Sequence, residues 1–336
     1  MPLNDVALKS RHPAFSVLPR LLLVLATVPA AAWTAAAVWF QVRPPLHWAF
    51  IGLAAAVAIA ICWLGLRRPR YGWIALVLAG ALVAAWWGSI KPSNDRDWAP
   101  DVMRGVTAEI NGDDVLVRNI RNFDWQSDDY AVQRWDTRHY KLSAITSVDL
   151  VSSVWDSPAI AHTMLSFGFA DGRHLVFSAE IRKKRGEAFS EIGGFFKQFE
   201  LVLIAADESD ILRVRTNLRG EQVSLYPVRL PPEKMRALFV SYLEKGNDLA
   251  REPEFYQTVT TNCTTVIFQL ARLIEPGMPL DWRILVSGYV PDYLYDHGAL
   301  LTRLPLQQAK QQALISGRAQ AATMADYSAV IRRPAP

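Results

Sequence analysis

Three long apolar runs occupy the chain before residue 91. They extend from Leu21 to Val42, from Leu46 to Leu66 and from Trp73 to Ile90. Each is at or near the length that a helix needs to cross the ~30 Å hydrocarbon core of a bilayer. A cleaved signal peptide is the alternative for the first run, whose Leu-rich start is followed by Ala-rich sequence. Its length and the two further runs favour a three-span membrane anchor over residues 1–90.

Beyond residue 90 the pattern changes to short strand-like segments and amphipathic helices. Val106–Ile110 and Val115–Ile120 alternate around a polar Asn-Gly-Asp-Asp turn, which predicts a hairpin. Further strands are predicted at 134–140, 145–154, 198–207, 212–217 and 223–228, and a helix from Pro232 to about Arg251. We expect a polar linker at 91–104, a folded domain at 105–305, and a C-terminal helix and tail at 306–336, disordered after about Met324.

A second predicted hairpin brings a histidine next to a carboxylate. Two strand-like segments, 161–169 and 173–181, flank a loop that ends in Gly172. A three-residue loop with this glycine in the left-handed conformation is common. That register places His162 opposite Glu180, with Cβ atoms roughly 5 Å apart. A two-residue turn would instead pair His162 with Ile181, so the prediction depends on one residue of register.

The segment from Thr260 to Leu270 begins an amphipathic helix with a cysteine in its first turn. Asn262 is a favourable N-cap, because its side-chain oxygen can accept a bond from a free amide. The helical spacing shows in Val266, Ile267, Leu270, Leu273 and Ile274. Unpaired N–H groups and the helix dipole at this position lower the pKa of a thiol. The alternative is that Cys263 is a small, inert residue packed at a helix start.

The distribution of Lys and Arg adds a topology. The N-terminal tail carries Lys9, Arg11 and Arg20, and the second loop carries Arg67, Arg68 and Arg70. The first loop carries only Arg43. The positive-inside rule then places the N-terminus in the cytoplasm and everything after Ile90 outside. Residues 1–90 carry +6, which leaves −2 for the rest of a chain whose net charge is +4. The net positive charge therefore reflects membrane topology, and no nucleic-acid partner is expected.

The chain has two cysteines, Cys62 in the second run and Cys263 in the outer part. They are not expected to form a disulfide within one chain. A lone cysteine in an oxidising compartment is a liability unless it is buried, paired between molecules or reactive, which favours a function for Cys263. No zinc spacing, phosphate-binding glycine loop or nucleic-acid motif is present, so no metal or cofactor is expected.

A cysteine at a helix start, a histidine on a strand and a carboxylate that orients it make a thiol nucleophile site. The candidate catalytic residues are Cys263, His162 and Glu180. Candidates for substrate or oxyanion support are Asn262, Thr264, Ser166, Arg219 and Tyr256, together with the main-chain N–H of Cys263. Some have structural alternatives: Glu180 could pair with Arg182 or Arg185 on a solvated face, His162 alone could be structural, Arg219 could cap a turn, and Tyr256 could serve packing.

The order histidine, carboxylate, cysteine resembles the circularly permuted papain-like arrangement of the lecithin:retinol acyltransferase group. Several motifs further resemble the Lnb-type periplasmic domain, a family named for a lipoprotein transacylase. These are His162-Thr163…Leu165-Ser166-Phe167-Gly168-Phe169…Asp171-Gly172-Arg173, Ser178-Ala179-Glu180-Ile181-Arg182, Arg215-Thr216-Asn217-Leu218-Arg219-Gly220, Asn262-Cys263-Thr264-Thr265, Asp281-Trp282-Arg283 and Gly288-Tyr289…Tyr293-Leu294-Tyr295. The resemblance covers roughly Gly105 to Leu300.

This resemblance implies an α+β domain, with an antiparallel sheet packed on the cysteine-bearing helix. In the family, an acyl chain moves from the glyceryl group of a lipid-modified cysteine to that cysteine's amine, through an acyl-thioester on the enzyme. His162 and Cys263 match the family's functional residues directly, and Glu180 is carried over as the third member. Members with a three-span anchor can act on another acyl substrate, so the named reaction does not transfer automatically.

We therefore expect a multi-pass protein of the bacterial inner membrane with a periplasmic cysteine-dependent domain. Its expected activity is that of an acyltransferase or acyl hydrolase on lipid or lipoprotein substrates held in the membrane. The alternatives are a thiol amidase or peptidase acting on cell-wall peptides, and a non-catalytic binding domain.

Overall fold

The structure is a computed structural model that describes residues 14–334. Its contacts divide the chain into two compact units, one made of the residues up to Lys91 with Phe196–Gln198, the other of Pro92–Phe195 and Phe199 onward. Lys9 and Arg11, on which the predicted orientation partly rests, lie outside the described residues.

The first unit contains the three predicted spans as helices α1 (Ala14–Gln41), α2 (Leu46–Arg67) and α3 (Pro69–Ser89). All three are long and apolar enough to cross a membrane. Their large apolar side chains are mostly exposed, as lipid-facing positions require. A Cβ added at Gly72 would lie 2.5 Å from the Cα of Gly65, so α2 and α3 approach closely there, as small residues allow between membrane helices.

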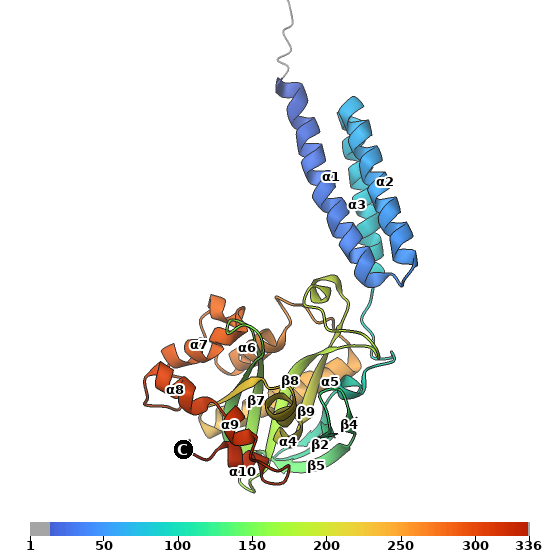
Figure 1. The fold of residues 1–336 in the computed structure, drawn as a ribbon. Helices are drawn as coiled ribbons and strands as arrows, with labels where there is room; N and C mark the ends of the chain where they lie inside the picture. Colours follow the sequence, from blue (N-terminus) through green and yellow to red (C-terminus); the bar gives the residue numbers. More distant parts are fainter. Residues whose placement is uncertain (1–13, 335–336) are drawn as a thin grey trace, which may run out of the picture. The chain divides into compact units, whose positions relative to one another are not determined.

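The second unit is built on an eight-stranded, mainly antiparallel sheet (Figure 1). Its strand order is β1-β2-β9-β8-β7-β6-β10, with β5 also paired to β2, and β2 runs parallel to β9. The strands are β1 (Thr107–Asn111), β2 (Asp114–Arg121), β5 (Trp135–Lys141), β6 (Ile145–Val154), β7 (Ala161–Phe169), β8 (His174–Arg182), β9 (Glu200–Ala206) and β10 (Gln222–Pro227); β3 (Asp124–Trp125) and β4 (Ala131–Val132) form a separate small sheet. The predicted hairpins β1–β2 and β7–β8 are confirmed.

Helices pack on both faces of this sheet. On one face, α5 (Pro232–Arg251) and α6 (Cys263–Ile274) share a core with the strands. The ring of Phe239 on α5 lies 5.2 to 5.7 Å from those of Phe167, Phe169 and Phe177. The other face is covered by the short helices α4 (Glu208–Ile211), α9 (Ser316–Ala319) and α10 (Tyr327–Ile331). The last two are red in Figure 1. The remaining helices are α7 (Val290–Asp296) and α8 (Leu306–Ala313).

Three expectations about local structure were wrong. The segment predicted as a strand at 212–217 overlaps a π-helix, Val214–Leu218, because alternation of apolar and polar residues over so few positions does not by itself separate strand from helix. The expected linker at 91–104 packs on the domain, with Trp98 and Val102 buried. The tail expected to be disordered after Met324 contains α10, and the ring of Tyr327 is fully buried. The polar composition of the linker and the tail did not indicate that they pack on the domain, because each segment buries only a few apolar side chains.

Candidate functional site

Helix α6 begins with the cap that the sequence predicts. The side chain of Asn262 accepts a hydrogen bond from the Thr265 amide (2.8 Å), and the Asn262 amide donates to the Thr265 hydroxyl (2.7 Å). This reciprocal pair fixes the first turn of the helix. It places Cys263 at the first helical position with 9% of its surface exposed. Asn262 therefore acts on the site by positioning the cysteine.

The β7–β8 register is the one that brings the histidine and the carboxylate together. Gly168 pairs with His174 and Leu165 with Phe177, and Gly172 has φ of +83° in the connecting loop. Continued along both strands, this register places His162 opposite Glu180. The ladder itself ends at Leu165, and α6 contacts both strands. The two strands therefore supply their side chains to the helix terminus where they are no longer paired with each other.

The imidazole of His162 is oriented from one side and faces the thiol with the other. Its Nε2 lies 2.7 Å from the Ser178 hydroxyl and 3.1 Å from Oε1 of Glu180. The thiol of Cys263 is the further hydrogen-bond partner of the ring. Because Nε2 is engaged by Ser178 and Glu180, Nδ1 is the nitrogen left for the thiol. The carboxylate thus fixes the ring orientation, which is the third member's role in a thiol site.

Glu180 is the centre of a buried polar network. The Ser178 hydroxyl donates to its Oε1 (2.8 Å), and Nη2 of Arg215 donates to the same oxygen at 3.3 Å. Arg182 donates to the main-chain carbonyls of Val102 and Met103. Arg185 pairs with Asp97. The alternative in which Glu180 pairs with Arg182 or Arg185 on a solvated face is therefore wrong.

The charges of this group shift three pKa values in the direction that activates a thiol. Burial alone raises the pKa of Cys263, but the neighbouring His162 outweighs it and brings that pKa down to about 7. Burial lowers the pKa of His162, yet Glu180 and Cys263 raise it to about 10. Burial raises the pKa of Glu180, and His162 and Arg215 lower it well below its ordinary value. Between about pH 7 and pH 10 the thiolate–imidazolium form is therefore favoured.

One pocket, which we call the Cys263 pocket, contains most of the predicted site. Its volume is about 680 Å³, and its wall includes Cys263, His162, Glu180, Asn262, Thr264, Arg219 and Tyr256. Ser166 lies elsewhere: it is fully buried and donates to Glu208 at 2.6 Å. It shares a strand face with His162 but lies four residues away, which is about 13 Å along β7. The position of Ser166 therefore does not agree with the prediction that this residue supports the substrate.

The remaining support residues have defined contacts. The hydroxyl of Thr264 is 2.9 Å from that of Thr163 and 3.9 Å from Sγ of Cys263. Burial raises the pKa of Tyr256, which keeps its hydroxyl protonated and able to donate. Nη1 of Arg219 lies 3.9 Å from Glu221. At the helix start, the amides of Cys263 and Thr264 are those without an intrahelical acceptor, and free main-chain amides of this kind can act as oxyanion donors.

Sequence reasoning missed Ser178 and Arg215. Ser178 lies two residues before Glu180, so the period-2 alternation of a strand gives both the same face and could have indicated it. Arg215 was noticed only as part of a motif, since a strand was expected there. Within residues 14–334, no group of three or more His, Cys, Asp or Glu side chains is arranged to hold a metal ion. Cys62 and Cys263 are both free thiols.

Comparison with known proteins adds one positive finding. Residues 131–288 match the family model described as the Lnb N-terminal periplasmic domain. No match was found among curated proteins or among solved structures. The matched range includes Cys263, His162 and Glu180. With the three candidate spans, it indicates an inner-membrane protein with a periplasmic domain. The segment 131–288 is thus similar to the Lnb N-terminal periplasmic domain family.

Proposed function

We propose that this protein is a membrane-anchored, cysteine-dependent acyltransferase or acyl hydrolase that works through an acyl-thioester at Cys263. The observation that carries the proposal is the alignment of Cys263, His162 and Glu180 in one pocket, with the pKa of the thiol lowered to about 7. A thiolate is the nucleophilic form of cysteine. At neutral pH the pair therefore holds both the nucleophile and a proton for the leaving group.

In the first half-reaction, Sγ of Cys263 attacks the carbonyl carbon of an ester. The negative charge that develops on the carbonyl oxygen is stabilised by the amides of Cys263 and Thr264 and by the Tyr256 hydroxyl. As the carbon–oxygen bond of the ester breaks, the leaving alkoxide takes the proton from the His162 imidazolium. The products are an alcohol and the acyl-thioester.

In the second half-reaction, the neutral His162 accepts a proton from the incoming nucleophile. An amine gives acyl transfer and water gives hydrolysis. The nucleophile attacks the thioester carbonyl, and the carbon–sulfur bond breaks to regenerate the thiolate. Glu180 holds the imidazole in place throughout and stabilises its charged form. The order His162, Glu180, Cys263 along the chain supports a permuted papain-like arrangement.

The surroundings of the pocket favour a lipid substrate over a peptide. Four large apolar side chains in its wall are substantially exposed: Trp155 (48%), Ile160 (41%), Phe189 (58%) and Leu285 (58%). Exposed apolar groups around a site indicate contact with an apolar partner. The tether is also short, because α3 ends at Ser89 and the Ser93 amide already donates to Glu200 of the domain. A lipid in the same bilayer would therefore meet the site at high effective concentration.

The topology follows the same proposal. A periplasmic domain after the third span requires the loop with Arg67, Arg68 and Arg70 and the N-terminus to be cytoplasmic. A reporter fused before α1 and one fused into the α2–α3 loop should both report cytoplasm. A periplasmic signal from either fusion would contradict this orientation.

The decisive experiment is a single-turnover reaction of the full-length protein in detergent with an acyl ester, followed by intact mass measurement. The wild type should gain the mass of one acyl group, which hydroxylamine removes. Cys263→Ala should gain nothing while keeping the thermal stability of the wild type. Acylation of the Cys263→Ala protein, or reaction with peptides in place of esters, would contradict the proposal; the second outcome would favour the amidase or peptidase.

A further inference from the structure

A second cavity adjoins the Cys263 pocket. This space, the α6 cavity, has a volume of about 440 Å³ and lies along one stripe of α6, beside the core strands and α7. Protein interiors have few voids larger than a water molecule, whereas ligand sites fall in the range of this volume. Its helix side is formed by Thr264, Ile267, Ala271 and Ile274. These residues are spaced three or four apart and so share one face of the helix.

Thr264 connects the two spaces, because it lines both of them. Its hydroxyl lies 3.9 Å from the sulfur of Cys263. The same hydroxyl is hydrogen-bonded to Thr163, and both threonine side chains are buried. Since these two hydroxyls satisfy each other, an apolar group passing this point would leave neither without a partner. The two spaces therefore meet at Thr264, directly beside the nucleophile.

The lining and the length of the α6 cavity fit one lipid acyl chain. Facing the helix are buried apolar residues, including Leu165, Leu238 and Val290. The helix stripe runs from Thr264 to Glu275, which is about 16 Å at ~1.5 Å per residue. One leaflet contributes about half of the ~30 Å hydrocarbon core, so a lipid acyl chain extends about 15 Å. At the end away from Cys263, the lining includes Glu275 and Lys234, whose opposite charges form an ion pair.

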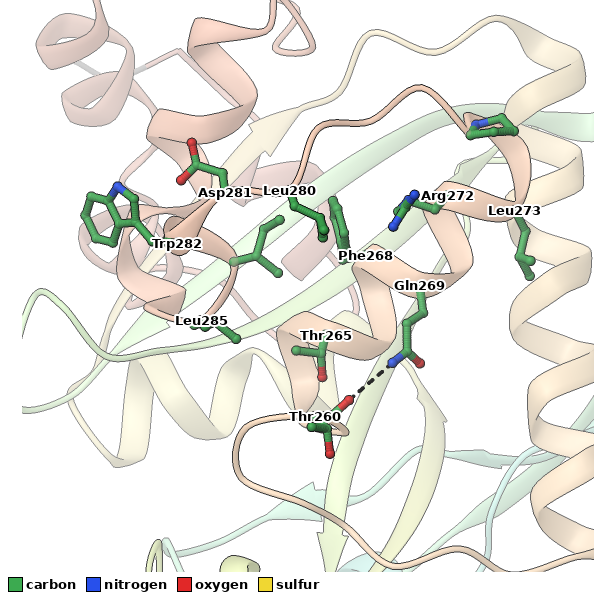
Figure 2. A pocket seen from close by; sticks show the side chains of 12 residues that line it. Thr260, Thr265, Phe268, Gln269, Arg272, Leu273, Leu280, Asp281, Trp282 and Leu285 are labelled. Carbon is green, nitrogen blue, oxygen red and sulfur yellow. Dashed lines mark hydrogen bonds between the residues drawn. The ribbon is translucent and has the colours of Figure 1, made fainter.

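The other apolar space next to α6 is less suited to a single chain. It is an open groove between the outer side of the helix and the segment with Leu280, Trp282 and Leu285 (Figure 2). Leu273 and Leu280 there are 72% and 78% exposed. A chain in this groove would keep much of its surface in water and gain less from burial. In the α6 cavity, by contrast, the walls are part of the core of the domain.

We infer that the α6 cavity holds the acyl chain of the substrate while its carbonyl carbon lies at Cys263. The cavity thereby makes the enzyme specific for long, straight acyl chains, with Ala271 on the wall about halfway along it. This inference rests on the proposed function and adds the substrate class to it. The headgroup and the leaving alcohol remain on the Cys263 pocket side of Thr264.

The first test compares two bulky substitutions on opposite sides of one helix. Ala271→Phe fills the α6 cavity, and Leu273→Phe adds a ring to the groove. The full-length variants in detergent react with 4-nitrophenyl butyrate and 4-nitrophenyl palmitate, and intact mass follows acylation of Cys263. Ala271→Phe should lower the palmitate rate at least about tenfold, equivalent to burying about two fewer methylene groups, with the butyrate rate unchanged. Leu273→Phe should leave both rates as in the wild type.

The second test needs no catalysis, so it separates this inference from the proposed function. The Cys263→Ala protein is irradiated with a palmitate analogue that carries a diazirine near the chain end, and the labelled peptide is mapped. Labels should fall between Ile274 and Pro279 or between Leu294 and Ala299. Labels there without any acyl-thioester in the wild type would refute the proposed function and keep the chain site. Labels on 280–285, or equal loss of palmitate activity in Leu273→Phe, would overturn the inference in favour of the groove.

Discussion

Replacing His162 with Gln removes the imidazole that lowers the pKa of Cys263, and the result can be calculated from the structure. Burial of the thiol remains in the variant, and burial raises a thiol pKa. The pKa should therefore rise from about 7 to the unperturbed value of 9.0 or above. A change of about two units corresponds to about 3 kcal/mol of interaction that favours the thiolate.

This shift has opposite effects on alkylation at low and high pH. At pH 7 about half of the wild-type thiol is ionised, against about 1% in the variant, a roughly 50-fold difference. A thiolate of higher pKa is intrinsically more nucleophilic, by roughly 8-fold for two units. The variant should therefore react about 6-fold more slowly than the wild type at pH 7. Above pH 9 it should react faster, because its thiolate is then formed and more nucleophilic.

The measurement is the rate of iodoacetamide alkylation against pH, on full-length protein in detergent. A Cys62→Ser background leaves Cys263 as the labelled thiol, and Cys263→Ala with Cys62 intact gives the rate of the membrane cysteine. The two rate profiles should cross between pH 7 and pH 10. Profiles with the same midpoint near pH 9 would refute the argument that His162 activates Cys263, and the domain would then be better explained as a binding module.

Three further results are expected. Glu180→Gln removes the charge that raises the pKa of His162, so the upper pH limit of acylation should move below about 10; an unchanged limit would exclude this role for the carboxylate. Arg332→Met leaves Glu208 fully buried without its cation and should destabilise the domain by about 3–5 kcal/mol, or roughly 10 °C in a thermal scan; a change below about 2 °C contradicts it. Gly246→Ala places a Cβ 2.6 Å from the main-chain carbonyl oxygen of Val106, so the free energy of unfolding should fall by about 1–3 kcal/mol. The midpoint of the alkylation profile of Cys263 should stay unchanged.

The grouping of Cys263, His162 and Glu180 could be predicted because the position of each residue depends on local rules. The Asn262 N-cap determines where α6 begins, and this places Cys263 in the first turn of the helix. Gly172, with its positive φ, determines the length of the loop after β7, and the loop length sets the register that places His162 opposite Glu180. Both rules act over a few residues, so one sequence is sufficient to apply them.

Other parts of the site depend on packing between distant segments. Arg215 reaches Glu180 because a π-helix directs it there, and the short alternating segment 212–217 gave no sign of that helix. The α6 cavity is closed by residues from β7, α5, α6 and α7, which are separated by more than a hundred positions. Ser166 was misplaced for a related reason: a strand pattern gives the face of a residue but not its distance from a site.

The ion pair of Arg332 has a consequence for how the domain is made. Its guanidinium pairs with Asp149 on β6, 183 positions earlier in the chain, and with Glu208 beside the sheet. Nearly the whole domain must therefore have been translocated before the charges on one face of the sheet are neutralised. Until then β6 and its neighbours belong to an incompletely folded domain, a state that is prone to aggregation and proteolysis. Correct assembly thus depends on export being completed, and shortened chains should be cleared rather than accumulate.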